Sequence, residues 1–183
     1  MNLPAGNVIK TDVDVATVDF LALLKELGVK LFNGYLAIAI KGNGGIEEGT
    51  LLFDNGKIVA ATYEYFKHGK TLLADKAFVR ILNASFAKHG SVDLVLLSNE
   101  QVQLVLAFNE NAITIPNEKD WSAFKGRTFS STYEDEITGV APMSTGVDVM
   151  QKYKLTDIDE TIGPRPKTKT VKDDKDELAT LLG

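Results

Sequence analysis

Three short apolar segments separated by two glycine-containing turns constrain the fold more than any other feature of the chain. In residues 34–41, 46–53 and 57–65, apolar side chains recur at alternating positions, which is typical of β-strands. Asn55 and Gly56 in the second turn accept the positive φ angles of tight hairpins. The pattern therefore predicts a three-stranded antiparallel meander, and its first strand is expected at a central position because both of its faces are apolar.

An amphipathic helix is expected before the meander. Asp14 or Thr17 is a suitable N-cap, and Gly28 suits the left-handed position that follows a helix end. Between them, apolar side chains recur at helical spacing and form one stripe. These side chains are Phe20, Leu23, Leu24 and Leu27.

Residues 70–116 complete the predicted domain. The periodicity predicts a long helix over residues 70–89 and a strand over residues 92–97. Ser98 and Gln101 are spaced as in a capping box, which predicts a short helix behind that strand, and residues 112–115 are expected to form an edge strand. The predicted fold class is α+β, with an antiparallel sheet of four to five strands, a three-stranded meander core and helices packed mainly on one face.

The composition changes near Pro116. Residues 1–116 are rich in periodic apolar segments and are predicted to form one globular α+β domain. Residues 117–183 hold three of the five prolines and are expected to form a partly ordered extension with a linker and short amphipathic helices. Trp121 and Phe124 are expected to pack back on the domain.

Composition also argues against several classes of function. The chain has no cysteine, which excludes disulfides, cysteine-ligated zinc, iron–sulfur clusters and thiol catalysis. A net charge of −5 argues against direct binding to nucleic acid. No apolar run approaches the roughly 20 residues of a membrane helix, and the first residues lack the pattern of a secretory signal. We therefore expect a cytoplasmic protein that binds neither nucleic acid nor membrane.

No motif of a catalytic, metal or cofactor site stands out. The glycine-rich residues 42–45 are followed by a strand rather than a helix, so a hairpin turn is favoured over a phosphate loop. His68 and His89 lack a metal or catalytic partner at a matching spacing. The acidic clusters fit no calcium loop and are interpreted as solvated surface or disordered runs. They lie at residues 47–48, 134–136, 157–160 and 173–177. We expect no catalytic residue, no metal and no cofactor.

Two groups of side chains are candidates for binding a partner protein. Tyr63, Tyr65 and Phe66 close the third strand and are interpreted either as core side chains or as a protein-binding patch, because aromatic residues dominate interface hot spots. Base stacking on nucleic acid is a third interpretation, but the chain lacks the basic groove that usually accompanies it. Leu178, Leu181 and Leu182 form the apolar stripe of a short C-terminal helix. A helix this short is only marginally stable in water on its own. It is expected either to fold back on its own domain or to anchor in a groove of a partner.

The segment N-G-Y-L-x-I…G-I-E-E-G-x-L-L-F-x-N-G-x-I-V-x-A-x-Y-E-Y, residues 33–65, resembles an uncharacterised archaeal family of unknown function. More loosely, G-x-L-x-F-x-x-G-x-I-V-x-A, residues 49–61, resembles the N-terminal domain of PatA-type response regulators. The resemblance covers roughly residues 15–115. It implies a non-enzymatic regulatory or interaction module of prokaryotic signalling, and it offers no catalytic residue to transfer.

The leading hypothesis is a non-enzymatic regulatory or adaptor protein that binds another protein. A homodimer is left open, because symmetric dimers are common and strand edges pair readily. One alternative is a small-molecule sensor with its ligand between the sheet and the helix over residues 70–89, which an enclosed apolar pocket would favour. Others are an accessory subunit of a larger complex and an enzyme that uses isolated carboxylates.

Overall fold

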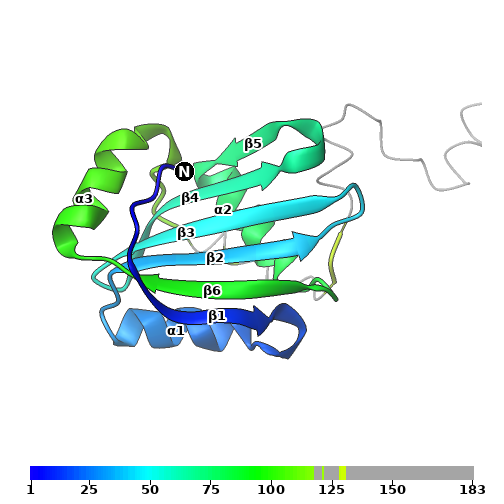
Figure 1. Ribbon diagram of the computed structural model, residues 1–183, viewed down its shortest axis with the longest axis horizontal. Coiled ribbons are helices and arrows are strands. Elements are labelled where there is room, and N and C mark those ends of the chain that lie inside the picture. Colours follow the sequence, from blue (N-terminus) through cyan, green and yellow to red (C-terminus); the bar gives the residue numbers. More distant parts are fainter. Residues whose placement is uncertain (118–120, 122–127, 131–183) are drawn as a thin grey trace, which may run out of the picture. The chain divides into compact units, whose positions relative to one another are not determined.

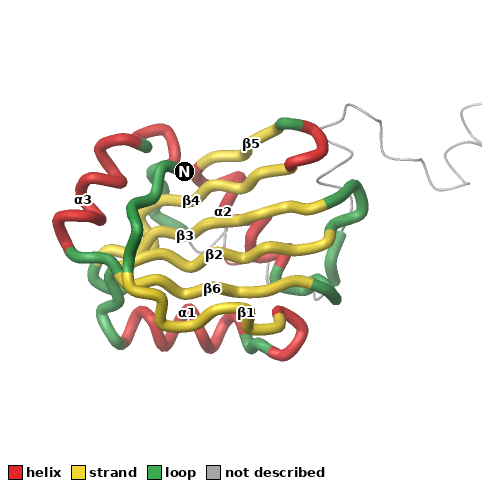
Figure 2. The backbone as a smooth tube through the Cα atoms, in the orientation of Figure 1, coloured by secondary structure: helices red, strands yellow, loops and turns green. Residues whose placement is uncertain are grey.

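The computed structural model describes residues 1–117, 121 and 128–130. They form a six-stranded antiparallel sheet with the strand order β1-β6-β2-β3-β4-β5 (Figures 1 and 2). The strands are β1 (Asn7–Asp14), β2 (Gly34–Lys41), β3 (Ile46–Asp54), β4 (Lys57–Tyr65), β5 (Lys70–Leu73) and β6 (Gly90–Leu96). The helices are α1 (Phe20–Val29), α2 (Ala74–Ala84) and α3 (Asn99–Phe108), with short 3-10 helices η1 (Val15–Thr17), η2 (Phe66–His68) and η3 (Glu110–Ala112).

The predicted meander is confirmed. β2 pairs with β3 and β3 with β4, both antiparallel, and β2 is central because β6 lies on its other side. At the turn between β3 and β4, Asn55 and Gly56 have φ angles of 47° and 77°. The α+β class is confirmed too, with six strands instead of the four to five expected.

The two additional strands are the two edges of the sheet. β5 occupies residues that were predicted to start a helix, and α2 begins only at Ala74, where a φ of 54° separates strand from helix. β1 is exposed along almost its whole length and pairs with β6 through two register shifts. The edge strand expected over residues 112–115 is wrong, because this segment makes only an isolated bridge between Ala60 and Ile113.

The helix ends also differ from the prediction. α1 is capped by Asp19, whose side chain accepts from Ala22 N, while Asp14 caps η1. The helix runs through Gly28, and Leu31 takes the positive φ of 50° after its end. Gly28 instead lies against the β3–β4 turn. The predicted capping box of Ser98 and Gln101 is confirmed at the start of α3.

The sheet carries helices on both faces, unequally. α1 and α2 cover one face and enclose the larger core, whereas α3 covers one end of the other face (Figure 1). The expected packing of Trp121 is confirmed by its ring, which stands edge-on to Phe78 with centroids 5.2 Å apart. Phe124, the expected linker and the C-terminal helices lie outside the described residues.

Candidate functional site

A buried ion pair joins α2 to the sheet. Arg80 on α2 is 0% exposed and Glu47 on β3 is 2% exposed. Arg80 Nη2 donates to Glu47 Oε2 at 2.6 Å, and the Tyr63 hydroxyl donates to the same oxygen at 2.6 Å. The interpretation of Glu47 as a solvated residue is therefore wrong. Adjacent side chains of a strand point to opposite faces, so only its neighbour Glu48 reaches the other face.

Aromatic rings complete this buried cluster. The Arg80 guanidinium carbon lies 5.2 Å and 5.6 Å from the ring centroids of Tyr63 and Tyr65, a cation–π geometry. Burial raises the pKa of the Tyr63 hydroxyl. The positive charge of Arg80 opposes this shift, and the hydrogen bond to Glu47 adds to it. Tyr63 therefore stays protonated near neutral pH. An enclosed cluster with a neutral tyrosine and a paired carboxylate is suited to fixing α2 on the sheet.

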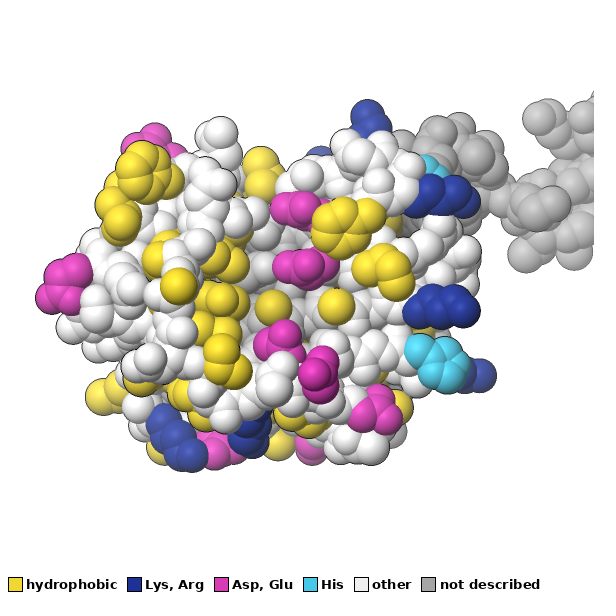
Figure 3. Space-filling model, viewed as in Figure 1, with side chains coloured by type: hydrophobic (Ala, Val, Ile, Leu, Met, Phe, Trp, Pro, Cys, Tyr) yellow, Lys and Arg dark blue, Asp and Glu magenta, His cyan; other side chains and the backbone are white. Residues whose placement is uncertain are grey.

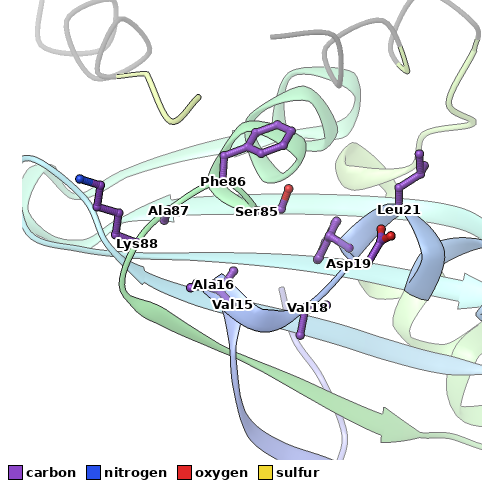
Figure 4. Close-up of a pocket in the computed structure, with 10 residues that line it drawn as sticks. Val15, Ala16, Val18, Asp19, Leu21, Ser85, Phe86, Ala87 and Lys88 are labelled. Atoms are coloured by element: carbon purple, nitrogen blue, oxygen red, sulfur yellow. The ribbon is translucent and has the colours of Figure 1, made fainter. Parts of the chain in front are cut away.

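An open groove of about 660 Å³ lies between η1 with the start of α1 and the segment after α2 (Figure 4). Its walls are mainly apolar, with Val15 and Val18 on one side and Phe86 and Ala87 on the other. Two polar side chains of the groove form hydrogen bonds with nearby backbone groups. Asp19 caps α1, and Ser85 Oγ donates to Leu82 O at 2.8 Å. The volume is in the range of sites for small molecules.

The sheet face that carries α3 is uncovered by helices over much of its width (Figure 3). We call the uncovered part the acidic face. Its carboxylates are Glu48, Glu64 and Asp93, and side chains of Ala37, Ala39, Thr50 and Thr62 lie between them. Glu48 and Glu64 are directly opposite each other on β3 and β4, an arrangement that is unfavourable for like charges.

The acidic face holds its charges with little compensation. The Met1 amino group lies 3.4 Å from Glu64 Oε1, and within the described residues no Lys or Arg forms an ion pair with the three carboxylates. Partial burial and, after it, Glu64 raise the pKa of Glu48. Burial, then Asp93 and Glu48, raise the pKa of Tyr35 at the same face. The negative charges of Glu48, Glu64 and Asp93 therefore act on one another and on Tyr35.

The candidate partner-binding residues are placed differently. Tyr63 and Tyr65 are 0% and 2% exposed, so the structure places both in the core, one of the interpretations left open. Phe66 follows β4 directly and is 53% exposed. Ile46 and Leu73 share the side of the sheet with Glu48 and Thr62, and are 56% and 39% exposed. Leu178, Leu181 and Leu182 lie outside the described residues.

The histidines are placed apart from these sites. His68 is in η2, as expected for a turn before Gly69, but His89 is exposed in the loop before β6 rather than at a helix end, since α2 ends at Ala84. In the described part of the chain, no three His, Asp or Glu side chains are grouped as metal ligands. None of the helices in that part is long and apolar enough to cross a membrane.

Sequence reasoning missed both Arg80 and the acidic face. Arg80 was unremarkable within an amphipathic helix, and Glu48 and Glu64 are 16 residues apart along the chain but paired across strands. The alternation in the meander was the available signal, because the register of a hairpin determines which side chains face each other.

Comparison with known proteins places the chain in a family. An uncharacterised protein of Archaeoglobus fulgidus is 31% identical over 113 residues, which are 62% of this chain and 43% of that protein. This chain thus matches less than half the length of its curated relative. No solved structure matches it. Neither match supports the likeness to PatA-type response regulators that the sequence suggested. Residues 1–109 match the family described as uncharacterised protein conserved in archaea (DUF2226), and the chain belongs to this family.

Proposed function

We propose that this protein is a non-enzymatic, cytoplasmic regulatory or adaptor protein that binds a basic surface of another protein through its acidic face. The observation that supports this proposal is an uncovered sheet face on which Glu48 and Glu64 oppose each other without a lysine or arginine partner among the described residues. A partner with lysine or arginine side chains relieves this repulsion on binding. Charge complementarity of this kind favours encounter and selects the partner.

Apolar side chains near the acidic face supply the second component of binding. Ile46, Phe66 and Leu73 are large apolar side chains that remain exposed at or next to this part of the sheet. Burial of such side chains contributes roughly 25 cal/mol per Å² of apolar surface removed from water. A basic segment with an apolar side therefore fits this surface. A place as accessory subunit of a larger complex is compatible with the same mode of binding.

The test is affinity purification of the full chain from the native cell, followed by reconstitution with each purified partner. Glu48→Lys reverses a charge in the acidic face and is expected to abolish binding. Glu26→Lys makes the same change of charge on α1, over the other face of the sheet, and is expected to leave binding unchanged. Binding should also weaken with added salt, because salt screens exposed charges. A partner that both variants retain, or both lose, contradicts the proposal.

A small-molecule sensor is the second candidate function, with its ligand in the groove beside α1. This groove is open and lies beyond the end of α2, whereas the expected site was an enclosed pocket between the sheet and that helix. Its volume of about 660 Å³ and its apolar walls suit an apolar ligand. Val18→Trp fills this groove without touching the acidic face. A metabolite extract that raises the melting temperature of the native chain but not of the Val18→Trp chain would favour the sensor. Loss of the effect with Glu48→Lys instead would assign the ligand to the acidic face.

A further inference from the structure

The buried side chains of α2 hold a short segment of the same chain through its backbone. Asn83 Nδ2 donates to Thr128 O at 3.2 Å, and Ser130 N donates to Asn83 Oδ1 at 3.1 Å. One side-chain amide thus binds a carbonyl and the N–H two residues further on, as a neighbouring β-strand does. Arg80 Nη1 donates to Ser130 O at 3.1 Å, a charge-assisted bond.

The side chain of the middle residue adds a second kind of contact. The ring of Phe129 lies over the Arg80 guanidinium, with the centroid 4.8 Å from its central carbon, and packs against the larger core. Arg80 therefore has Glu47 and tyrosine rings on the side of the sheet and Phe129 on the other. Asn83 is itself held by Arg80 Nη1 at 2.6 Å, so the two binding groups are oriented before the segment is added.

These contacts describe a site for an extended peptide. The hydrogen bonds go to main-chain atoms of residues 128 and 130, which any residue except a proline at position 130 presents, and the aromatic ring provides the contact that depends on residue type. We infer that Arg80 and Asn83 form a peptide-binding site, which holds the chain's own residues 128–130 and accepts in their place an extended segment with a central aromatic residue from another protein. The site is distinct from the acidic face, since α2 covers the opposite face of the sheet.

The chain's own residues 128–130 and a segment from another protein compete for this site, and the outcome depends on their effective concentrations. A segment attached to its own site by a short linker competes at an effective concentration on the order of millimolar, so an external segment binds weakly until the attached one is weakened. A partner that offers the same backbone groups and a larger contact area displaces it. An emptied site leaves the Asn83 amide and one Arg80 N–H without their partners from residues 128–130, which favours occupation by a new segment.

A labelled peptide with the sequence of residues 125–132, KGRTFSST, tests this inference by fluorescence anisotropy on the full chain. Ser130→Pro removes the N–H that donates to Asn83 while leaving Phe129 in place. This variant is expected to bind the peptide at least about tenfold more tightly than the native chain does, because the attached competitor is weakened. Phe129→Ala weakens the same competitor differently and is expected to give the same direction of change.

Two altered peptides, each tested on the Ser130→Pro chain, serve as controls. A peptide with N-methylserine at the position of Ser130 lacks the N–H for Asn83, and a peptide with alanine at the position of Phe129 lacks the ring. Both are expected to lose binding to the Ser130→Pro chain. The inference is overturned if native and variant chains bind the unmodified peptide equally, if neither binds it, or if the N-methylated peptide binds as well as the unmodified one.

Discussion

At the scale of single residues, Glu47 and Glu48 show how far the environment of neighbouring carboxylates can diverge. Glu47 is buried with Arg80, so Glu47→Gln leaves a buried cation without its counter-charge. We expect the free energy of unfolding to fall by about 3–5 kcal/mol, measured by urea denaturation. Glu48→Gln removes repulsion from Glu64 and is the matched control, with an expected change within about 0.5 kcal/mol or a small gain. Equal losses in the two variants would contradict the assignment of the ion pair.

The raised pKa of Glu48 gives a second expectation at this scale. Because its pKa in the folded protein lies above the ordinary value of 4.5, the folded state binds more protons than the unfolded state in the interval just above pH 4.5. The contribution of Glu48 to stability therefore falls as pH rises through that interval and recovers on acidification. Glu48→Gln should flatten this part of the curve of unfolding free energy against pH, with Glu64, Asp93 and the Met1 amino group unchanged. An identical curve for both proteins would contradict the raised pKa.

At the scale of elements, the strands with alternating apolar side chains were predictable and the edge strands were not. β2, β3 and β4 carry their own signal, because each buries at least one face. β1 and β5 are mostly exposed and are defined by pairing with β6 and β4, so their residues show no apolar alternation. The end of α1 was predicted at Gly28, but the helix continues through this residue. Gly28 allows close contact with the β3–β4 turn instead.

The contact between α1 and the β3–β4 turn leads to a prediction for two glycines. Gly56 has a φ of 77°, and a Cβ there would lie 2.4 Å from the carbonyl oxygen of Gly28. Gly69 has a φ of 55°, but a Cβ there meets nothing within 4 Å. Gly69→Ala is expected to cost about 1–2 kcal/mol for its backbone conformation alone. Gly56→Ala should cost more than this by urea denaturation, since backbone must also move. A smaller loss for Gly56→Ala would disprove the close contact.

At the scale of the whole molecule, the candidate sites are made by pairing across strands and helices, which explains why single segments did not reveal them. Glu47 and Arg80 are 33 residues apart, and Asn83 is 45 residues from Thr128. The hairpin register relates Glu48 to Glu64, but the position of α2 over the sheet depends on packing that no local pattern encodes. The exclusion of thiol chemistry, by contrast, needed only the composition.

Trp121 tests whether residues beyond Pro116 unfold together with the sheet. It is the single tryptophan of the chain, and its ring packs against Phe78 in the larger core. Phe78 is a fully buried residue of α2, so separation of Trp121 from it exposes part of the larger core to water. We therefore expect tryptophan fluorescence and far-UV circular dichroism to report the same midpoint in urea, the mark of one cooperative transition. Phe78→Leu should lower both midpoints together. A fluorescence transition at lower urea than the dichroism transition would show that the segment around Trp121 separates before the sheet unfolds.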